Sequence, residues 1–215
     1  MKLSPASVLT FARLLVVLFV AQAAIAHPHK RSEVVRFRLD PARSKFIVHA
    51  DRTGIAWFKG KSHFIAAKEF SGEASLSTDT VSPASLEITV KTASLEETGA
   101  AFTPEQKAII KKELDELVLE SGKYPDIVFR STRVTGSPKP GGFDVRIEGD
   151  LALHGVTKHI TIPAHVSISG DELRAAGEFS IDRKDFRVNA TDAFHGSVRV
   201  KHKLRFTFDI IGNRI

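Results

Sequence analysis

Apolar and polar residues alternate along most of the chain, and this period of two restricts the fold more than any other feature. In FDVRIEGDLAL the apolar or small positions are Val145, Ile147, Gly149, Leu151 and Leu153. Alternate side chains of a β-strand point to opposite faces of its sheet, so the stretch predicts a strand with one apolar face. The pattern is typical of antiparallel sheets, because parallel strands are buried on both faces and read as unbroken apolar runs.

The same alternation recurs before and after this stretch. It is found in VRFRLD, SKFIVHAD, SLEITVKTA, DIVFRST, HITIPAHVSI, ELRAAGEFSID and VRVKHKLRFTFDII. Turn-forming stretches such as DPARS, GSPKPGG, HGVTK and SGDE separate these runs. About eight to ten antiparallel strands joined by short connections predict an all-β fold, either a barrel or a sandwich.

One helix is expected to interrupt the strands. Thr103 can cap its N-terminus, Pro104 occupies the first helical position, and Gln106 completes a capping box. Its apolar positions at helical spacing are Ile110, Leu114, Leu117 and Val118. Gly122 marks a plausible end. A single amphipathic helix of this size can lie over one opening of a barrel.

Residues 1–26 have the features of a secretory signal peptide. Lys2 and Arg13 supply the positive charge, and the apolar stretch from Leu14 ends in the small-residue pattern AIA. The stretch is shorter than the about 20 apolar residues of a transmembrane helix. An uncleaved membrane anchor is the alternative. Residues 27–215 are expected to form a single domain.

Composition and motifs exclude several classes of function. The chain has no cysteine, which excludes a disulfide framework, thiol chemistry and cysteine-ligated zinc. Removal of Lys2 and Arg13 with the signal lowers the formal net charge from +6 to +4. Basic residues on the polar faces have few aromatic neighbours, which argues against a nucleic-acid partner. No catalytic triad, nucleophile elbow or phosphate-binding loop is found, so we expect no enzyme activity.

Three histidines in GDLALHGVTKHITIPAHVSI raise the question of a metal site. His154, His159 and His165 all fall on the polar face of the expected hairpin or at its rim. At about 3.3 Å per residue, His165 lies about 20 Å from His159. The spacing predicts surface histidines and no metal site, with weak incidental metal binding as the alternative.

Several motifs resemble the YceI-like family. FRLDPARSKFIVHADRTG resembles the family's ID..HS.V.F strand pair, and EFSGEASLSTD resembles its G.F.G....D segment. SGKYPDIVFRST is similar to KYP.I.F.ST, GDLALHGVTKHITIP to G.LTL.GVT..V.L, and FSIDRKDFRV to I.R.DFG. The motifs follow the family's order and extend roughly from Val35 to Ile211.

The resemblance implies an extended lipocalin-like antiparallel β-barrel in the bacterial periplasm, with about eight strands. It further implies a carrier whose apolar tunnel holds a polyisoprenoid, a quinone or a similar amphiphile, and it implies no catalytic residues. No other cofactor is expected, and the protein is expected to be a monomer or homodimer. A non-catalytic envelope stress or interaction module with a solid barrel is the alternative. The chain departs from the family's motifs at two places. The stretch AFTPEQKAIIKKELDELVLESGKYP predicts a reshaped tunnel mouth, and Arg187 in place of a glycine predicts a changed turn.

The apolar faces supply the candidate ligand-binding residues of the lumen. They are Phe37, Phe46, Val48, Ile88, Val90, Phe129, Ile147, Leu151, Ile162, Ala164, Phe179, His202, Leu204, Phe206 and Phe208. Small inward residues such as Gly149 and Gly177 either leave a channel or balance bulky neighbours, and the resemblance favours the channel. For His202 the alternatives are a buried hydrogen-bonded side chain, a bulge that turns it outward, or a contact with a ligand headgroup.

Basic residues occupy the polar face of the first and last strands. They are Arg36, Arg38, Arg199, Lys201, Lys203 and Arg205. If these strands pair, the six residues form one patch that can attract anionic lipid, at about 1 kcal/mol per basic residue near a charged membrane. The alternative is a solvated face whose charges discourage aggregation.

Overall fold

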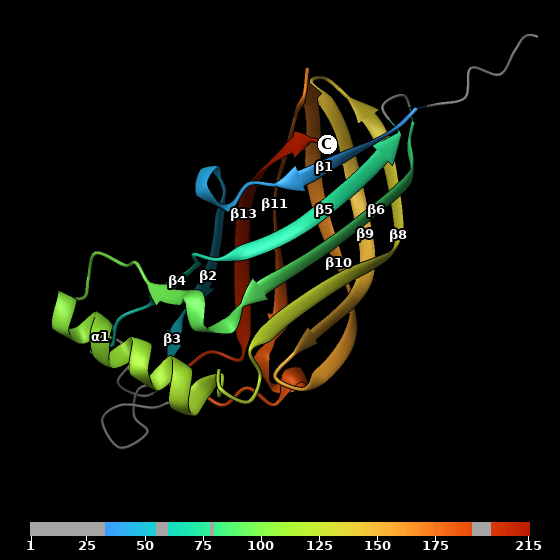
Figure 1. Cartoon of the computed structure of the whole chain (residues 1–215). Coiled ribbons are helices and arrows are strands. Elements are labelled where there is room, and N and C mark those ends of the chain that lie inside the picture. Colours follow the sequence, from blue (N-terminus) through green and yellow to red (C-terminus); the bar gives the residue numbers. More distant parts are fainter. Residues whose placement is uncertain (1–32, 55–59, 78–79, 191–198) are drawn as a thin grey trace, which may run out of the picture. The chain divides into compact units, whose positions relative to one another are not determined.

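The computed structural model describes residues 33–54, 60–77, 80–190 and 199–215 of the chain. These residues form mostly β-strands, together with one α-helix (Figure 1). The predicted signal peptide, residues 1–26, lies outside the described residues and stays a prediction.

Eight antiparallel strands close into a barrel. In the order around the barrel they are β1 (Val34–Leu39), β5 (Phe70–Ser77), β6 (Val81–Lys91), β8 (Asp126–Lys139), β9 (Gly142–Leu153), β10 (Val156–Ser169), β11 (Glu172–Asp182) and β13 (Lys203–Arg214). The ring closes because β13 pairs with β1, with Phe37 opposite Arg214. The predicted antiparallel barrel is confirmed, and its closure excludes the sandwich.

The barrel wall divides at β13, which has two partners on the same side. Its last residues pair with β1, whereas its stretch Arg205–Asp209 pairs with β2. Beyond β2 (Lys45–Ala50), the wall continues through β4 (His63–Ala67) and β7 (Leu95–Glu97). Lys68 N, in the connection between β4 and β5, donates to Ser94 O, directly before β7, at 3.2 Å. The end of the barrel nearer the helix therefore has extra strands in its wall (Figure 1).

Short elements complete the chain. They are the 3₁₀ helices η1 (Pro41–Arg43), η3 (Thr92–Ser94) and η5 (Arg183–Phe186), and a two-stranded sheet of β3 (Arg52–Thr53) and β12 (Arg199–Val200). The predicted hairpin turn lies at His154 and Gly155, between β9 and β10. Both residues have positive φ, at 52° and 73°, as in the type I′ turn that matches the twist of a hairpin.

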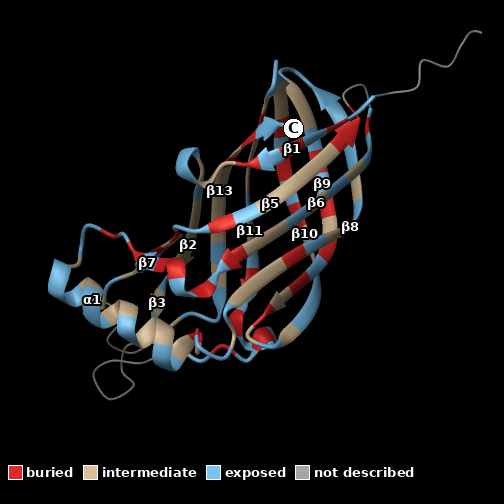
Figure 2. Ribbon diagram, viewed as in Figure 1, coloured by how far each residue is buried: buried red, intermediate tan, exposed pale blue. Residues whose placement is uncertain are grey.

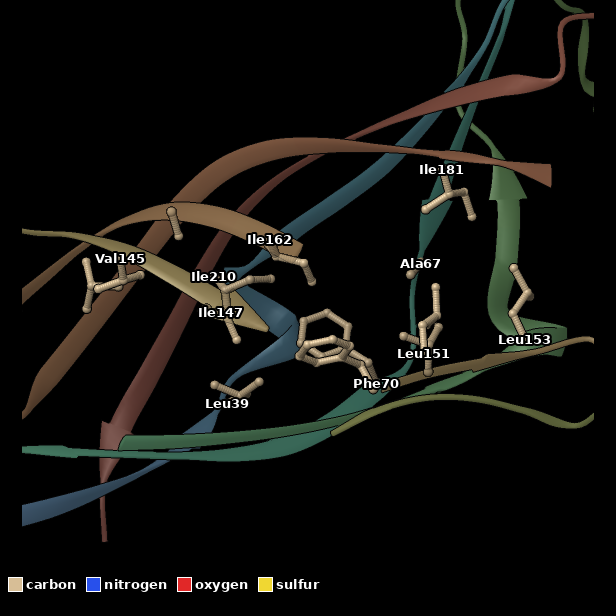
Figure 3. Packing of buried hydrophobic residues seen from close by; sticks show 14 of the residues in the cluster. Leu39, Ala67, Phe70, Val145, Ile147, Leu151, Leu153, Ile162, Ile181 and Ile210 are labelled. Carbon is tan, nitrogen blue, oxygen red and sulfur yellow. The ribbon is translucent and has the colours of Figure 1, made fainter. Parts of the chain in front are cut away.

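The apolar faces of the strands meet inside the barrel. Phe37 is fully buried, and Leu39, Ile147, Ile162 and Ile210 come together in the interior from four strands (Figures 2 and 3). This interior carries the apolar burial that stabilises a chain without cysteine.

Two inward glycines make room for aromatic rings. A Cβ atom on Gly149 would lie 2.6 Å from the Cζ atom of Phe129, and one on Gly177 would lie 2.8 Å from that of Phe208. These small residues therefore balance bulky neighbours, and the interpretation that they leave a channel is wrong at both positions.

The predicted helix is α1 (Pro104–Glu113), and it continues as a π-type turn (Leu114–Val118). Its capping box is present, since Thr103 N donates to Gln106 Oε1 at 3.1 Å and Gln106 N donates to Thr103 Oγ1 at 3.3 Å. Leu117 was expected on the apolar face, but it is 62% exposed. The wider turn, closed by Leu119 N and Leu114 O, shifts the helical phase and turns Leu117 outward. Among the described residues, no helix has the length and apolar character needed to span a membrane.

Candidate functional site

A cavity that we call the larger cavity lies between α1 and the extended end of the barrel. Its volume is about 600 Å³, within the range of about 300–1,000 Å³ that is usual for small-molecule sites. Its apolar lining includes Val48, Ile65, Ile110, Leu114, Leu204 and Phe206. Because both the helix and the π-type turn contribute side chains to it, the helix covers this opening as predicted.

The smaller cavity lies further along the barrel, towards the end where β1 closes the ring. Its volume is about 100 Å³, and its lining includes Phe46, Ile88, Ile147, Ile162, Phe179 and Phe208. This is below the about 300 Å³ at the lower end of the usual range for small-molecule sites. By itself it is too small for a long apolar chain.

Four phenylalanine rings, each lining one of the two cavities, contact one another, and we call them the phenylalanine cluster: Phe46, Phe179, Phe206 and Phe208. The rings of Phe179 and Phe206 are stacked, with centroids 4.8 Å apart and planes 12° apart. Phe46 lies 6.0 Å from Phe206 and 6.5 Å from Phe208. Phe206 borders the larger cavity and Phe179 the smaller one. The single tunnel that the family resemblance implies is therefore divided by side chains of the protein itself.

The predicted lumen residues fall into four groups. Val48, Leu204 and Phe206 line the larger cavity, and Phe46, Ile88, Ile147, Ile162, Phe179 and Phe208 line the smaller one. Phe37, Val90, Phe129, Leu151 and Ala164 are buried but line neither cavity. His202 is exposed.

The placement of His202 in the lumen is wrong. The alternation predicted one continuous strand, but the chain bends between β12, which ends at Val200, and β13, which begins at Lys203. Arg183 N donates to the carbonyl oxygen of His202 at 2.9 Å, so this contact with η5 holds the bend. The bend turns the His202 side chain outward, while Val200 and Leu204 on either side still line the larger cavity.

Sequence reasoning missed the charged residues of the larger cavity, apart from Arg199, which it assigned to the basic patch. Among the described residues, its charged or titratable lining consists of Arg52, Lys61, His63, Arg183, Arg199 and Glu113. Most of them lie on short elements or loops, where alternation gives no signal. The one available signal was Arg183, which falls in the stretch FSIDRKDFRV already noted for its resemblance to the family.

Arg183 is 91% buried, since its exposed fraction is 9%. Its guanidinium donates to three backbone carbonyls, at 2.7 Å to Val188 O and at 3.3 Å to both Val200 O and Lys201 O. Burial lowers the pKa of this guanidinium from its ordinary value. The described residues place no carboxylate within 4 Å of it.

His63 lies at the edge of the same cavity and is paired with a buried carboxylate. Its Nδ1 atom is 2.8 Å from Glu97 Oε2, and its ring stacks on Phe102 at 4.9 Å. Glu97 Oε1 also accepts hydrogen bonds from the backbone N–H groups of Phe64 and Gly99. Three donors thus satisfy Glu97, and the remaining ring nitrogen of His63, Nε2, is the one left for a ligand.

The three histidines of the hairpin lie outside the lumen, as predicted. His159 and His165 are exposed and pair with Asp150 at 3.0 Å and Asp144 at 2.9 Å. His154 sits at the rim, where its Nε2 atom is 2.9 Å from Glu120 Oε2. The described residues bring together no group of three histidine, aspartate or glutamate side chains suited to a metal ion.

The predicted basic patch is wrong as a single surface. β1 does pair with β13, but Phe37 lies opposite Arg214. Arg205 is nine residues before Arg214, or about 30 Å at about 3.3 Å per residue. The pairing therefore places Arg36 and Arg38 far from the basic residues at the other end of β13. Both also lie close to Glu73, at 2.6 Å and 3.6 Å, which offsets their charge.

The comparisons with known proteins agree with this architecture. The model of the YceI-like domain matches residues 37–211. The chain belongs to the YceI-like family. A UPF0312 protein of Pseudomonas fluorescens is 34% identical over 127 residues, which cover 55% of this YceI-like chain and 61% of that protein, less than two thirds of its length. Protein YceI of Escherichia coli is 28% identical over 191 residues, which cover 84% of each chain.

Two solved structures share the YceI-like barrel. Burkholderia cenocepacia BcnA has a TM-score of 0.63 and 19% identity, and the match covers 80% of this chain and 98% of BcnA. A polyisoprenoid-binding domain from Saccharophagus degradans has a TM-score of 0.59 and 15% identity, and the match covers 85% of this chain and 100% of that domain. At these identities the likeness concerns the fold.

Proposed function

We propose that this YceI-like protein is a non-catalytic periplasmic carrier that holds one amphiphile with a long apolar chain in the larger cavity. The observation that carries the proposal is an apolar space of about 600 Å³ between the barrel and α1. The proposal also draws on the solved polyisoprenoid-binding domain that shares the fold. Prenyl alcohols, quinones and related lipids have the required chain.

Burial of the chain supplies the affinity. Each CH₂ group transferred from water contributes about 0.8 kcal/mol. One isoprene unit of five carbons then contributes about 4 kcal/mol before the cost of ordering the ligand. Affinity should therefore rise steeply with chain length until the tail reaches the phenylalanine cluster, where the larger cavity ends.

A cavity-filling variant tests the binding site. Ala50 lines the larger cavity, so Ala50→Phe places a ring where the ligand chain would lie. Displacing two CH₂ groups of the ligand costs about 1.6 kcal/mol, which is more than tenfold in affinity, since about 1.4 kcal/mol is tenfold. Geranylgeraniol binding, measured by displacement of the neutral dye N-phenyl-1-naphthylamine, should weaken accordingly.

Ala66→Phe is the matched control. Ala66 lies on the adjacent strand β4 and lines neither cavity. Equal binding by the two folded variants would contradict the proposed site. Organic extraction of the protein from its native envelope, followed by mass spectrometry, tests the ligand class. A preparation with no bound amphiphile would favour the stress or interaction module.

The periplasmic location has its own test. If residues 1–26 are a cleaved signal, the protein recovered from the periplasmic fraction should begin at His27. An intact N-terminus in the membrane fraction would instead support the uncleaved anchor.

A further inference from the structure

Positive charge gathers around the larger cavity. Within the described part of the chain, its lining includes four residues with fixed positive charge, Arg52, Lys61, Arg183 and Arg199, and one carboxylate, Glu113. These residues come from β3, the loop before β4, η5, β12 and α1, so the fold brings the charge together from distant parts of the sequence.

Arg183 is the least solvated of these cations. Its three hydrogen-bond acceptors are neutral carbonyl groups, which orient the guanidinium without cancelling its charge. Burial of an ion is costly unless an opposite charge accompanies it. Among the described residues, these carbonyls use three of its five N–H groups, which leaves two to donate to a ligand.

Lys61 and His63 provide a second basic side of the cavity. Lys61 donates to the carbonyl of Ala101, and its ammonium lies 5.1 Å from the centroid of the Phe102 ring. The Glu97 carboxylate beside His63 is fully buried, does not line the cavity and already has three donors. These three donors offset part of its negative charge.

We propose that the larger cavity selects amphiphiles with an anionic headgroup, a carboxylate or a phosphate, held among Lys61, Arg183 and Arg199 while the apolar chain occupies the rest of the cavity. This inference rests on the proposed function, because it assigns the headgroup of the same ligand. Carboxylate and phosphate oxygens accept charge-assisted hydrogen bonds from lysine and arginine, which are shorter and stronger than neutral ones.

Ligand pairs with identical tails test the headgroup directly. Geranylgeraniol is compared with geranylgeranyl monophosphate, and hexadecan-1-ol with hexadecanoate, by dye displacement below the concentration at which each forms micelles. In at least one pair the anion should bind at least tenfold more tightly than its alcohol at low salt. The advantage should shrink as salt rises, because the Debye length falls to about 8 Å at 0.15 M. The pair that shows the larger advantage identifies the source as prenyl phosphate or fatty acid.

Charge-removing variants locate the effect. Lys61 and Arg199 are exposed, so Lys61→Gln and Arg199→Gln should fold normally and weaken anion binding several-fold more than alcohol binding. Lys158→Gln is the matched control, since Lys158 is exposed near the same end of the barrel but lines neither cavity.

The outcomes separate this inference from the proposed function. Equal affinity of alcohols and anions in both pairs would overturn the headgroup inference and leave the carrier function standing. An equal loss in all three variants would also overturn it, because the effect would then be general electrostatics. Absence of binding by every alcohol and every anion would overturn both.

Discussion

Phe206 is predicted to limit the length of the chain that the protein can hold. Its ring borders the larger cavity on one side and stacks on Phe179, which borders the smaller cavity, on the other. Phe206→Ala removes one of the two stacked rings and should join the cavities into one. The larger space would then include the additional volume of about 100 Å³ and the space of the lost ring.

Two magnitudes decide whether the variant can be measured. Phe→Ala in a core costs about 3–5 kcal/mol of unfolding free energy, and Phe206 should fall at the lower end because it is only partly buried. Domains of this kind have about 5–15 kcal/mol available, so the variant should fold. One further isoprene unit is worth about 4 kcal/mol before ordering costs. Even a third of that value is about tenfold in affinity.

The assay is the affinity of a prenyl alcohol series from geraniol through farnesol and geranylgeraniol to longer members. In the unchanged protein, affinity should rise along the series and then level off. In Phe206→Ala it should level off at least one isoprene unit later.

Phe208→Ala is the matched control. It removes the same ring from the next inward position of β13, but Phe208 lines only the smaller cavity, so the limit should not move. Phe206→Leu gives a milder version should the alanine variant prove too unstable. An unchanged length limit in a folded Phe206→Ala or Phe206→Leu protein would refute the division of the lumen by these rings.

Three further predictions concern stability. Gly177→Ala would place a Cβ atom 2.5 Å from Pro163 O and 2.8 Å from Phe208 Cζ, so the midpoint of urea unfolding should drop by the equivalent of about 1–3 kcal/mol. Arg187 has φ of 57°, a left-handed conformation that costs other residues about 1–2 kcal/mol relative to glycine. Arg187→Gly removes this cost, but part of the gain in stability is offset by the greater freedom of glycine in the unfolded chain. The melting temperature should therefore rise modestly, and a lower melting temperature would contradict this account. Burial, and then the nearby charge of Arg205, lowers the pKa of His49 from its ordinary value of 6.5. At a pH between the lowered pKa of His49 in the folded protein and its ordinary pKa in the unfolded chain, only the unfolded chain takes up the proton. The free energy of unfolding should therefore fall as the pH drops below 6.5. His49→Gln should flatten urea unfolding curves measured across that range, and an unchanged pH profile would contradict the assignment.

The barrel wall was predictable because it depends on local patterns. Alternation assigned the inward residues of β9, β10 and β11, and the apolar residues of these strands do face the interior. The capping box at Thr103 and the turn at His154 are likewise signals that span only a few residues. The glycine that the family motif led us to expect at position 187 is not needed for its turn, since Arg187 N still bonds to Lys184 O at 3.0 Å.

The errors arise where tertiary contacts override a local pattern. His202 follows the alternation in sequence, but a hydrogen bond from η5 bends the chain at that residue. Leu117 follows helical spacing, but the π-type turn shifts the phase. The six basic residues of the predicted patch lie at polar positions of the sequence pattern. The register of β1 on β13 separates those of β1 from the others, and the pattern within a single strand does not predict how two strands are aligned.

Strand register also explains why the chain-length limit and the headgroup site should be separable. Phe179 lies directly opposite Phe206 on the neighbouring strand, and opposite side chains on one face have Cβ atoms about 4.5–5.5 Å apart. The stack at 4.8 Å is therefore a consequence of the barrel wall itself. The basic residues, in contrast, come from short elements and loops, where substitutions leave the ladder of backbone hydrogen bonds intact. It follows that changes at Lys61 or Arg199 should alter headgroup preference without moving the length limit, and that Phe206→Ala should do the reverse.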